Sequence, residues 1–467
     1  MDLLLAHAYL LKEDPLELRV MKPYAPLGIL YLSAWLKKSG FSVGVYDATF
    51  RSRDEFVPTL QEHQPRVVGI YVNMMTKRHT LRMIQEARAS GARVVLGGPE
   101  PRHHAHQFLD RGADVSVVGE GEETLAELLP ALEKSGVHHL HHIAGIFFRD
   151  DSGQVVQTPE RPRLADINLL PWPDRDAIDL TRYLETWRIH HGASSLSLIT
   201  ARGCPFTCSW CSHAVYGHSH RRRRPEGVVD EIAYLRERWN PDQLWIADDV
   251  FTVNKDWIHH FQAELKRRHI TLPYECISRA DRLSEEVADL LQQSGCRRLW
   301  VGSESGSQRI LDEMSRGVTV EEVRQGVKWL QQRGIEAGLF IMVGYGDETE
   351  AEIVETIQHL KITNPDQFLI TVAYPITGTT YHHDLNDKVI SPLDWDTTTD
   401  RDKRFTGRPS DRYYRFATSR IHHEVALHRA LHTPTPRLRT LTREWAATQV
   451  ARVGMALTRR VGRWSAP

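Results

Sequence analysis

Three cysteines lie within one short stretch of the chain, residues 201–213, whose sequence is Ala-Arg-Gly-Cys-Pro-Phe-Thr-Cys-Ser-Trp-Cys-Ser-His. They follow the spacing Cys-x3-Cys-x2-Cys, at Cys204, Cys208 and Cys211. Clustered thiolates are soft ligands that suit zinc or an iron–sulfur cluster. Structural zinc needs a closed set of four ligands, which His213 would complete. A [4Fe–4S] cluster held by three cysteines instead leaves one iron open to a substrate. The stretch therefore predicts either a structural or a catalytic metal centre.

The chain has the composition of an ordinary folded protein with several domains. Its 467 residues predict about three folded units, and 41% hydrophobic with 25% charged residues argue against a disordered chain. The sum of Lys and Arg is 59 and that of Asp and Glu is 60, which gives a net charge of −1. Such a balance provides no general attraction to nucleic acid, so we expect no nucleic-acid partner.

Neither the start of the chain nor its cysteine content indicates export. The opening Met-Asp-Leu-Leu-Leu-Ala-His-Ala lacks the basic start and the cleavage site of a signal peptide. No apolar run approaches the ~20 residues of a spanning helix. Five cysteines are few and odd in number for a disulfide scaffold, and we expect Cys276 and Cys296 to be buried core residues. The sequence predicts a cytoplasmic, reduced protein.

The elements that must position the cysteines begin with a domain over residues 1–135. Short apolar runs there predict five strands, at residues 3–6, 42–46, 67–72, 93–96 and 114–118. Amphipathic stretches between them predict helices at residues 26–39, 53–62, 77–90, 103–111 and 122–134. This alternation predicts a doubly wound parallel sheet with helices on both faces.

Polar and glycine-rich loops follow several of these strands. Residues 97–100 read Gly-Gly-Pro-Glu and residues 119–122 read Gly-Glu-Gly-Glu. Ligands of open parallel sheets bind beyond the carboxyl ends of the strands, and glycine lets the backbone approach a ligand closely. We therefore expect a ligand site at this edge rather than a set of simple turns.

A second series of strands and helices spans residues 191–390. Strands are expected at residues 195–200, 243–247, 274–277, 298–301, 337–342 and 368–373, with helices such as 226–239 and 320–333 between them. A parallel series of this length predicts a partial barrel of six strand–helix units, with chemistry at the carboxyl ends of its strands. The three-cysteine stretch directly follows the first of these strands.

Two segments flank this barrel. Residues 136–190 are weakly periodic and predict a linker or covering loop, in which the His138–His142 cluster is interpreted as a solvated patch rather than a metal site. Residues 391–467 predict a mainly helical carboxyl-terminal segment that begins with a polar, turn-rich part.

At the cysteine stretch the sequence resembles the cluster motif of the radical S-adenosylmethionine superfamily. Together with the amino-terminal sheet it resembles the cobalamin-binding members of that superfamily, over about residues 1–390. The resemblance implies a [4Fe–4S] cluster on the three cysteines, S-adenosylmethionine, cobalamin, and an electron donor of the flavodoxin or ferredoxin type. Members include methyltransferases that act on unactivated carbon and the anaerobic magnesium-protoporphyrin monomethyl ester cyclase.

The resemblance also assigns the binding of S-adenosylmethionine to residues at successive strand ends. Trp210 is expected to pack on the adenosyl group, Glu304 to bond the ribose or amino end, and Gly344 to lie near adenine. The full expected set is Trp210, Asp248, Asp249, Ser278, Arg279, Ser303, Glu304 and Gly344.

The cobalamin site is expected at the edge of the amino-terminal sheet. The residues that the resemblance implies are Asp47, Thr49, Asn73, Gly97, Gly98, Pro99, Gly119, Glu120, Gly121, Glu122 and Thr124. Well-known cobalamin modules carry Asp-x-His-x-x-Gly, whose His ligates cobalt. The corresponding stretch here is Asp-Ala-Thr-Phe-Arg-Ser at residues 47–52, in which Thr49 stands where that His would be. Either cobalt lacks a His ligand from this loop or the domain no longer binds cobalamin. We expect the first, cobalamin bound with no imidazole on cobalt from this loop.

Two arginine-rich segments each allow two interpretations. The run Arg221–Arg224 is either a contact to an anionic substrate or cofactor, or a solvated patch. Residues 437–464 carry many arginines with apolar residues at near-helical spacing, among them Trp445, Val461 and Trp464. Such a stretch either lies on a membrane surface, at the inner face of the membrane, or packs on its own domain or on a partner.

Three functions compete on the sequence. The first is a radical enzyme that methylates an unactivated carbon of a small molecule, with a lipid-like molecule or a tetrapyrrole as the candidate substrate. The second is a radical cyclase or rearrangement enzyme of the same family. The third is a zinc-stabilised binding protein without catalysis.

Overall fold

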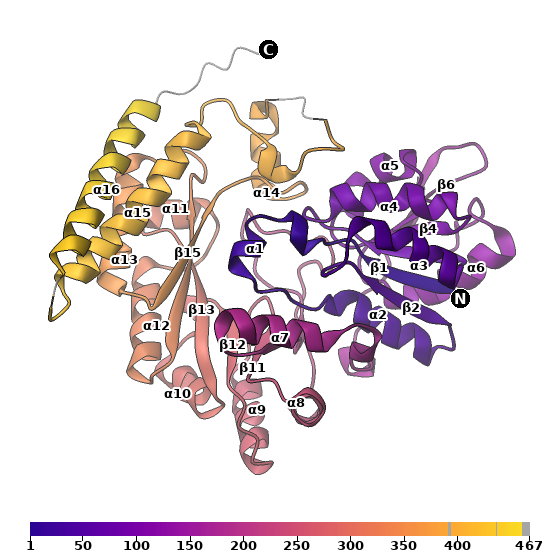
Figure 1. Ribbon diagram of the computed structural model, residues 1–467, viewed down its shortest axis with the longest axis horizontal. Helices are drawn as coiled ribbons and strands as arrows, with labels where there is room; N and C mark the ends of the chain where they lie inside the picture. Colours follow the sequence, from indigo (N-terminus) through magenta and orange to yellow (C-terminus); the bar gives the residue numbers. More distant parts are fainter. Residues whose placement is uncertain (391–393, 436, 460–467) are drawn as a thin grey trace. The chain divides into compact units, whose positions relative to one another are not determined.

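The computed structural model describes residues 1–390, 394–435 and 437–459, and these fall into two compact units (Figure 1). The first unit comprises residues 1–205, 213–247 and 394–399. The second comprises residues 206–212 and most of the chain from Asp248 onward.

A seven-stranded sheet forms the centre of the first unit, with the strand order β2-β1-β3-β4-β5-β6-β7. Its parallel strands are β1 (Leu3–His7), β2 (Val43–Asp47), β3 (Val67–Tyr71), β4 (Arg93–Gly97) and β5 (Val115–Val117). The crossing helices are α2 (Leu27–Lys38), α3 (Phe56–His63), α4 (Lys77–Ala89), α5 (Pro101–Asp110) and α6 (Glu122–Ser135). A short helix, α1 (Glu17–Val20), precedes α2.

Both faces of this sheet are covered by helices, because side chains along each strand alternate between two apolar layers. Leu4 and Ala6 of β1 belong to the buried layer that includes residues of α3, α4 and α5. Leu3 and Leu5 belong to the opposite layer, which includes residues of α2 and α6. This two-sided burial confirms the doubly wound sheet and leaves the carboxyl ends of its strands to carry a site.

The segment expected as a linker, residues 136–190, is more ordered than predicted. It contains an antiparallel hairpin of β6 (Ile146–Arg149) and β7 (Val155–Gln157), which extends the sheet beyond β5. It ends in α7 (Leu180–His191), whose first turn is capped by the Asp179 carboxylate accepting from the Arg182 N–H at 3.2 Å. Strands this short carry too few residues for their alternation to be visible in the sequence.

The second sheet has six strands in chain order, as the sequence predicts for a partial barrel. They are β8 (Ser195–Leu198), β11 (Gln243–Ile246), β12 (Tyr274–Ser278), β13 (Cys296–Glu304), β14 (Glu336–Val343) and β15 (Gln367–Val372). The intervening helices are α8 (Pro225–Trp239), α9 (Lys255–Arg267), α10 (Glu285–Gln293), α11 (Gln308–Glu313), α12 (Val320–Gln332) and α13 (Glu350–Thr363). A small antiparallel ladder joins β9 (Ala201–Arg202) to β10 (Arg221–Arg222).

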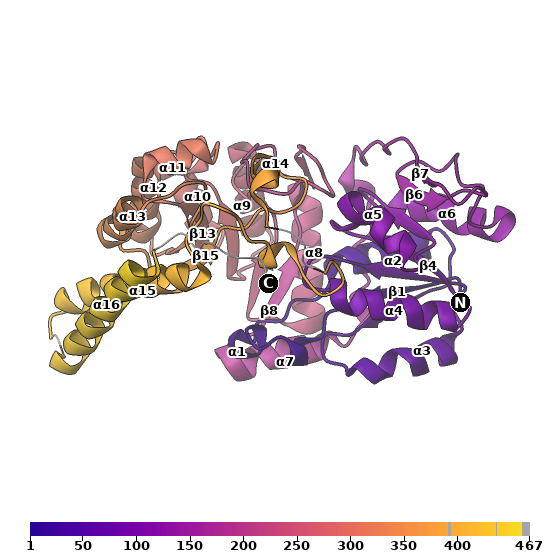
Figure 2. The same ribbon diagram turned by 90° about the horizontal axis from the view of Figure 1, so that it is seen from above.

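After β15 the chain is helical, with α14 (Thr380–Leu385), α15 (Asp411–Leu431) and α16 (Leu438–Thr458). Helices α15 and α16 lie side by side in both ribbon views (Figures 1 and 2). Gly454 of α16 permits this close approach, because a Cβ there would lie 2.4 Å from the Phe416 ring. Buried Glu424 of α15 binds Lys361 of α13 at 2.9 Å and so fastens the pair to the barrel helices.

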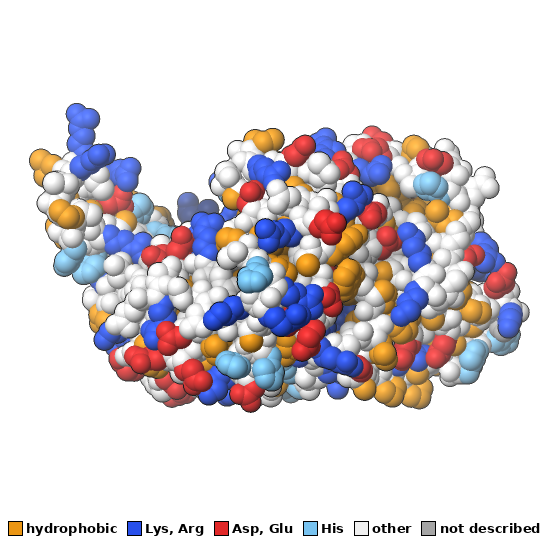
Figure 3. Space-filling view, turned by 90° about the horizontal axis from the view of Figure 1, so that it is seen from below, with side chains coloured by type: hydrophobic (Ala, Val, Ile, Leu, Met, Phe, Trp, Pro, Cys, Tyr) orange, Lys and Arg blue, Asp and Glu red, His pale blue; other side chains and the backbone are white. Residues whose placement is uncertain are grey.

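The outer face of α16 combines basic and apolar side chains (Figure 3). Its exposed hydrophobic residues are Leu438, Trp445, Val450, Val453 and Leu457. Val461 and Trp464, which the sequence analysis placed in the same stretch, lie outside the described residues. Among the described residues, no helix has the length and apolar character that a membrane span requires.

Candidate functional site

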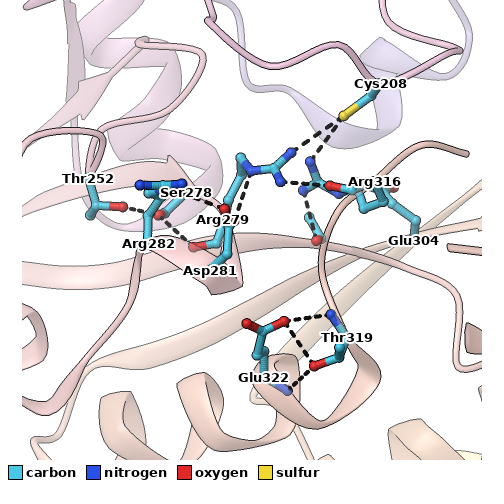
Figure 4. A network of polar contacts seen from close by, with 11 residues as sticks. Cys208, Thr252, Ser278, Arg279, Asp281, Arg282, Glu304, Arg316, Thr319 and Glu322 are labelled. Atoms are coloured by element: carbon cyan, nitrogen blue, oxygen red, sulfur yellow. Dashed lines mark hydrogen bonds and ion pairs between the residues drawn. The ribbon is translucent and has the colours of Figure 1, made fainter. Parts of the chain in front are cut away.

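In the second unit, two buried guanidinium groups point to the sulfur of Cys208 (Figure 4). It accepts hydrogen bonds from Arg279 Nη1 at 3.5 Å and from Arg316 Nη1 at 3.4 Å. A thiolate is the form in which cysteine binds metal, and two guanidinium groups complement its negative charge. Hydrogen bonds to sulfur also tune the potential of an iron–sulfur cluster.

Arg279 is held in place from three sides. Its Nε donates to Asp281 at 2.8 Å, and its Nη2 donates to the Arg316 carbonyl at 2.6 Å. The ring of Phe206 lies 3.8 Å from its guanidinium carbon. Its Nη1 contacts the Cys208 sulfur, and the binding of S-adenosylmethionine that the sequence analysis expects of Arg279 stays a prediction.

Arg316 was not anticipated from the sequence. Its Nη2 donates to the Gly302 carbonyl at 2.9 Å, and its Nε lies 3.6 Å from Glu304 Oε1. Gly302 makes room for it, because a Cβ there would lie 2.2 Å from Arg316 Nη2. Arg316 follows α11 and stands far from the cysteines in the chain, so no local spacing reveals its role.

Glu304 ends strand β13 in an unusual backbone geometry. The pairing of β13 with β14 shifts register between Gly302 and Glu304, which leaves Ser303 as an extra residue. Glu304 has a φ of 60°, a left-handed conformation that is uncommon outside glycine. Its carboxyl is buried, and burial raises its pKa although Arg316 and Arg279 act in the opposite direction. Such strain at a strand end is typical of functional positions.

The remaining polar residues expected at the strand ends differ in their surroundings. Asp248 is buried and Asp249 is exposed, directly after β11. The buried hydroxyl of Ser278 shares a hydrogen bond with Thr252, and that of Ser303 lies 3.0 Å from His359 Nε2.

Trp210 and Gly344 also lie in the second unit. Trp210 is half-buried against a cluster that includes Met314, Tyr345 and Tyr381. Its Nε1 is buried and has no hydrogen-bond partner within the described part of the chain, so it remains a free donor. Gly344 has a φ of 77° and donates its N–H to Glu348 at 2.5 Å.

The other cysteines divide as the sequence suggests. Cys204 and Cys211 are half-buried, whereas Cys276 and Cys296 are buried in strands β12 and β13. Across residues 1–390, 394–435 and 437–459, no three His, Cys, Asp or Glu side chains are grouped to hold a metal ion. The members of the 138–142 histidine cluster bond separately; His138, for example, bonds the Arg149 carbonyl at 2.9 Å.

The first unit contains a cavity of about 410 Å³ beside the carboxyl edge of its sheet. Seven of the residues expected to bind cobalamin line it: Asn73, Gly97, Gly98, Gly119, Glu120, Gly121 and Glu122. Four others do not line it: Asp47, Thr49, Pro99 and Thr124. Tyrosines and leucines form much of the remaining wall, together with His7 and Arg202. Its size and apolar character suit a small organic ligand or part of a larger one.

Glycine is required at the cavity edge. Gly98 has a φ of 110°, and a Cβ there would lie 2.5 Å from the Val72 carbonyl oxygen. At Gly97, by contrast, a Cβ would meet no atom within 4 Å, because the position faces open space.

Two acidic residues of the cavity wall are already paired. Arg202 binds Glu120 at 2.7 Å and Glu122 at 2.6 Å, and Arg221 binds Glu120 at 2.6 Å. Burial raises the pKa of Glu120, but the hydrogen bonds from Arg221 and Arg202 outweigh it and hold that pKa below its ordinary value. These carboxylates shape the wall by orienting Arg202.

The same contacts resolve part of the arginine run. Arg221 binds Glu120, and Arg223 binds the buried Glu231 at 2.6 Å, whereas Arg224 is largely exposed. Arg221 and Arg223 are therefore structural ion-pair partners within the first unit. Of these three arginines, only Arg224 fits the interpretation of a solvated side chain.

Asp47 and Thr49 form a separate network next to the cavity. Asp47 accepts from Thr49 Oγ1 at 2.7 Å and from Tyr183 Oη at 2.5 Å, and it lies 3.3 Å from His7 Nδ1. Because β1 and β2 are parallel neighbours, His7 and Asp47 stand opposite each other. His7 lines the cavity and was missed, since a single histidine in an apolar strand carries no motif.

Comparison with known families matches both halves of this architecture. Residues 198–360 match the radical SAM superfamily, and residues 18–129 match the B12 binding domain. The first match contains the three-cysteine stretch and the strand ends around Glu304. The second contains the glycine-edged loops of the cavity.

Curated relatives span most of the chain. An uncharacterized methyltransferase of Pyrococcus horikoshii is 27% identical over 79% of this chain and 80% of its own length. The anaerobic magnesium-protoporphyrin IX monomethyl ester cyclase of Synechocystis is 25% identical over 79% of this chain and 75% of its own length.

A solved structure confirms the fold. The methyltransferase TsrM of Kitasatospora setae, determined with cobalamin and a [4Fe–4S] cluster, superposes with a TM-score of 0.68 at 22% identity. The superposition covers 83% of this chain and 75% of that protein. With both domains matched in one chain and in this order, the protein belongs to the cobalamin-binding branch of the radical S-adenosylmethionine superfamily.

Proposed function

We propose that this chain is a methyltransferase that transfers a methyl group to an unactivated carbon of a small molecule. The observation that carries the proposal is the buried Cys208 of the three-cysteine stretch, whose sulfur accepts hydrogen bonds from Arg279 and Arg316. Besides their bonds to Asp281 and to the Gly302 carbonyl, these two cations converge on one sulfur. They suit a thiolate that holds an anionic cluster.

The proposed cluster ligands are Cys204, Cys208 and Cys211. Around them, the carboxylates of Asp248, Asp249 and Glu304 offer acceptors for an ammonium group or ribose hydroxyls. The unpartnered Nε1 of Trp210 and the flat face of its ring suit an adenosyl group. Ser278, Ser303 and Gly344 complete the proposed site for S-adenosylmethionine, and Arg279 acts on it through Cys208.

The proposed cobalamin site is the glycine-edged cavity of the first unit. Gly97, Gly98, Gly119 and Gly121 permit close approach of a ligand, and the tyrosine-rich wall suits a flat heteroaromatic group. Arg202, held by Glu120 and Glu122, is a fixed part of the wall next to these glycines. The proposal also includes the four expected residues that do not line the cavity, as supports of the loops at its edge: Asp47, Thr49, Pro99 and Thr124.

When bound, the cluster with S-adenosylmethionine supplies a 5′-deoxyadenosyl radical, and cobalamin supplies a methyl group. The chain's own residues bind and orient these groups and keep water from the reactive atoms. A low-potential flavodoxin or ferredoxin is the proposed electron donor. The substrate class carried over from the sequence is a lipid-like molecule or a tetrapyrrole.

Product analysis under anaerobic conditions tests the proposal. Methyl transfer should give one 5′-deoxyadenosine, one S-adenosylhomocysteine and one product heavier by a methyl group in each turnover. Deoxyadenosine without S-adenosylhomocysteine would instead favour a cyclase or rearrangement enzyme, as the Synechocystis relative suggests. Stoichiometric zinc without iron would leave only the zinc-stabilised binding protein.

Glu304 provides a test of the proposed site for S-adenosylmethionine. A charge-assisted hydrogen bond contributes roughly 1.5–3 kcal/mol, so Glu304→Gln should weaken binding by about one to two decades. Iron content should not change. Glu336→Gln, a substitution at the opposite end of a neighbouring strand, is the matched control. Unchanged affinity in Glu304→Gln would remove this residue from the site.

The domain limits follow from this assignment. We propose a cobalamin-binding domain over residues 1–135 and a radical core over residues 191–390, with residues 136–190 as a linker or covering loop and residues 391–467 as a helical carboxyl-terminal segment. Contact of α16 with the inner face of a membrane remains part of the proposal, supported by its exposed Trp445 and Leu457. Co-sedimentation with anionic vesicles tests it, and Trp445→Ser should abolish the binding.

A further inference from the structure

A second cavity, of about 460 Å³, lies in the second unit at the carboxyl end of β15. One wall is formed by the last two residues of that strand and the two that follow it, residues 371–374. The other wall comes from residues 401–415, which include the start of α15. In a parallel barrel, the carboxyl ends of the strands are where substrates bind. No motif noted in the sequence covers this cavity.

Cationic side chains dominate the lining. Five basic residues face one acidic residue, Asp411; the basic residues are Arg401, Lys403, Arg404, Arg408 and Arg415. Lys403 is neutralised by Asp400 at 2.7 Å, and Arg404 lies 3.4 Å from Asp411. Within the described ranges, Arg401, Arg408 and Arg415 have no carboxylate at ion-pair distance. Three guanidinium groups therefore line the cavity without a carboxylate in ion-pair contact among the described residues.

Arg408 is the most constrained of the three. Its Nε and Nη2 are buried and have no hydrogen-bond partner within the described residues. Its guanidinium carbon lies 4.6 Å from the Tyr414 ring centroid, which fixes the plane of the group. Buried donors left without acceptors cost about 1–3 kcal/mol, so such groups mark a place where an acceptor is to be bound. The planar fork matches the oxygens of a carboxylate or phosphate.

Aromatic faces accompany these cations. Tyr374, Phe405 and Tyr414 all line the cavity. Arg401 lies over the ring of Tyr374, with its guanidinium carbon 5.7 Å from the centroid. Rings next to cations bind flat molecules that carry an anionic group, because the ring packs while the oxyanion is paired.

The cavity adjoins a residue of the proposed site for S-adenosylmethionine. A Cβ on Gly344 would lie 2.7 Å from Arg408 Nη2 and 2.5 Å from Tyr414 Cε1. Gly344 follows β14, the strand next to β15. A molecule held by Arg408 is therefore next to the strand end at which the radical chemistry is proposed.

We propose that this cavity binds the substrate through a carboxylate or phosphate group carried by a flat ring system. The oxyanion is held by Arg408 and Arg415, with Arg401 at the rim, and the ring packs on Tyr374 and Tyr414. The identification of the bound molecule as the substrate rests on the proposed function, whereas the binding of an anion in this cavity is independent of it.

Three probes with the same ring separate charge from shape: 2-naphthyl phosphate, 2-naphthoate and uncharged 2-naphthol. Titration calorimetry on the full chain with its reconstituted cluster should show the two anions binding at least about tenfold more tightly than naphthol. Their affinity should fall as salt rises. Preference for phosphate over carboxylate, or the reverse, identifies the oxyanion. Equal binding of naphthol would overturn the proposal.

Variants place the binding in this cavity. Arg408→Gln and Arg415→Gln should each weaken anion binding by about tenfold. Arg412→Gln is the matched control. Arg412 is exposed and lies in α15, as Arg415 does, but it does not line the cavity. If Arg408→Gln does not fold, Arg401→Gln and Arg415→Gln, both at exposed side chains, still decide the matter. Wild-type affinity in all variants would overturn the proposal.

A parallel assay keeps this inference separate from the proposed function. The same preparation is assayed for 5′-deoxyadenosine formed without substrate. Anion binding without any deoxyadenosine would support the cavity and contradict the radical enzyme. Deoxyadenosine without anion binding would support the radical enzyme and contradict the proposed anion site in the cavity.

Discussion

The proposed ligand sites of the two units are built from different materials. In the first unit, the cavity edge is mostly backbone, formed by Gly97, Gly98, Gly119 and Gly121 against a tyrosine-rich wall. In the second, buried charges surround Cys208, with Arg279, Arg316 and Glu304 bonded to each other or to the sulfur. A backbone edge recognises a ligand by shape, whereas a charged site also sets the protonation and potential of what it holds.

This difference predicts different responses to substitution. Replacing a glycine at an edge changes the available space, so binding weakens while the chemistry of the other unit is unaffected. Replacing a buried charge leaves its partners uncompensated, which costs several kcal/mol and changes reactivity as well. The predictions below test this contrast, from complete loss of activity to a change in pH dependence.

The largest effect is expected at Cys208. Cys208→Ala removes one of three proposed cluster ligands, so cleavage of S-adenosylmethionine should be abolished and iron content should fall. The substitution of Cys204 or Cys211 should have the same effect. Iron analysis and deoxyadenosine formation after anaerobic reconstitution measure both. Cys276→Ala, at a buried cysteine of β12, should retain the cluster. Activity in Cys208→Ala would contradict the assignment.

Arg316 should give the next largest effect. Arg316→Gln removes a positive donor from the Cys208 sulfur, so an electron is added to the cluster less easily and its reduction potential should fall. We expect about tenfold slower cleavage of S-adenosylmethionine, by analogy with the loss of one charged hydrogen bond. A redox titration followed by electron paramagnetic resonance measures the shift.

Arg282 supplies the matched control for that experiment. Its side chain is half-exposed and binds Asp281, the carboxylate that also holds Arg279, and it does not bond the Cys208 sulfur. Arg282→Gln should leave the potential unchanged. An equal shift in both variants would mean that general charge, rather than the bond to sulfur, determines the potential.

In the first unit, substitutions at two adjacent glycines distinguish a loss of ligand space in the cavity from backbone strain in the fold. Gly97→Val should extend into the cavity without touching the protein, so cobalamin uptake should fall by about tenfold with no change in Tm. Gly98→Ala forces a left-handed residue against the Val72 carbonyl and should destabilise the fold by about 1–2 kcal/mol. Equilibrium dialysis and thermal unfolding measure the two effects. Unchanged uptake in Gly97→Val would place the ligand elsewhere.

The sequence predicts the first site better than the second for a physical reason. Glycines that permit close approach are found in contiguous loops after regular strands, so their spacing is visible without coordinates. Arg316 bonds the Cys208 sulfur from a distant part of the chain, where its sequence context is that of an ordinary surface arginine. His7 lies across a strand pair from Asp47, and only the parallel register brings them together. The hairpin of β6 and β7 was missed because such short strands carry little periodicity.

The smallest expected effect concerns Glu348, which supports Gly344 at the end of β14. Burial raises its pKa to about 7, whereas the Gly344 N–H and Arg408 act to lower it and Glu352 acts to raise it. A carboxyl whose pKa is raised on folding contributes stability below its ordinary pKa of 4.5, and this contribution is lost as the pH rises through about 7. Glu348→Gln cannot ionise. Relative to the wild type, the variant should therefore gain about 1–3 kcal/mol in free energy of unfolding between pH 5 and pH 8.

Glu352 is the matched control, because its pKa moves the other way. The hydrogen bond from Arg309 lowers it to about 2, so its contribution is present above the ordinary pKa of 4.5 and is lost only as the pH falls toward 2. Glu352→Gln should therefore shift the Tm by the same amount at pH 5 and pH 8. Thermal unfolding across this range separates the two carboxyls. Parallel Tm profiles for Glu348→Gln and the wild type would show that Glu348 stays ionised, and that the strand end holds a full negative charge beside Arg408.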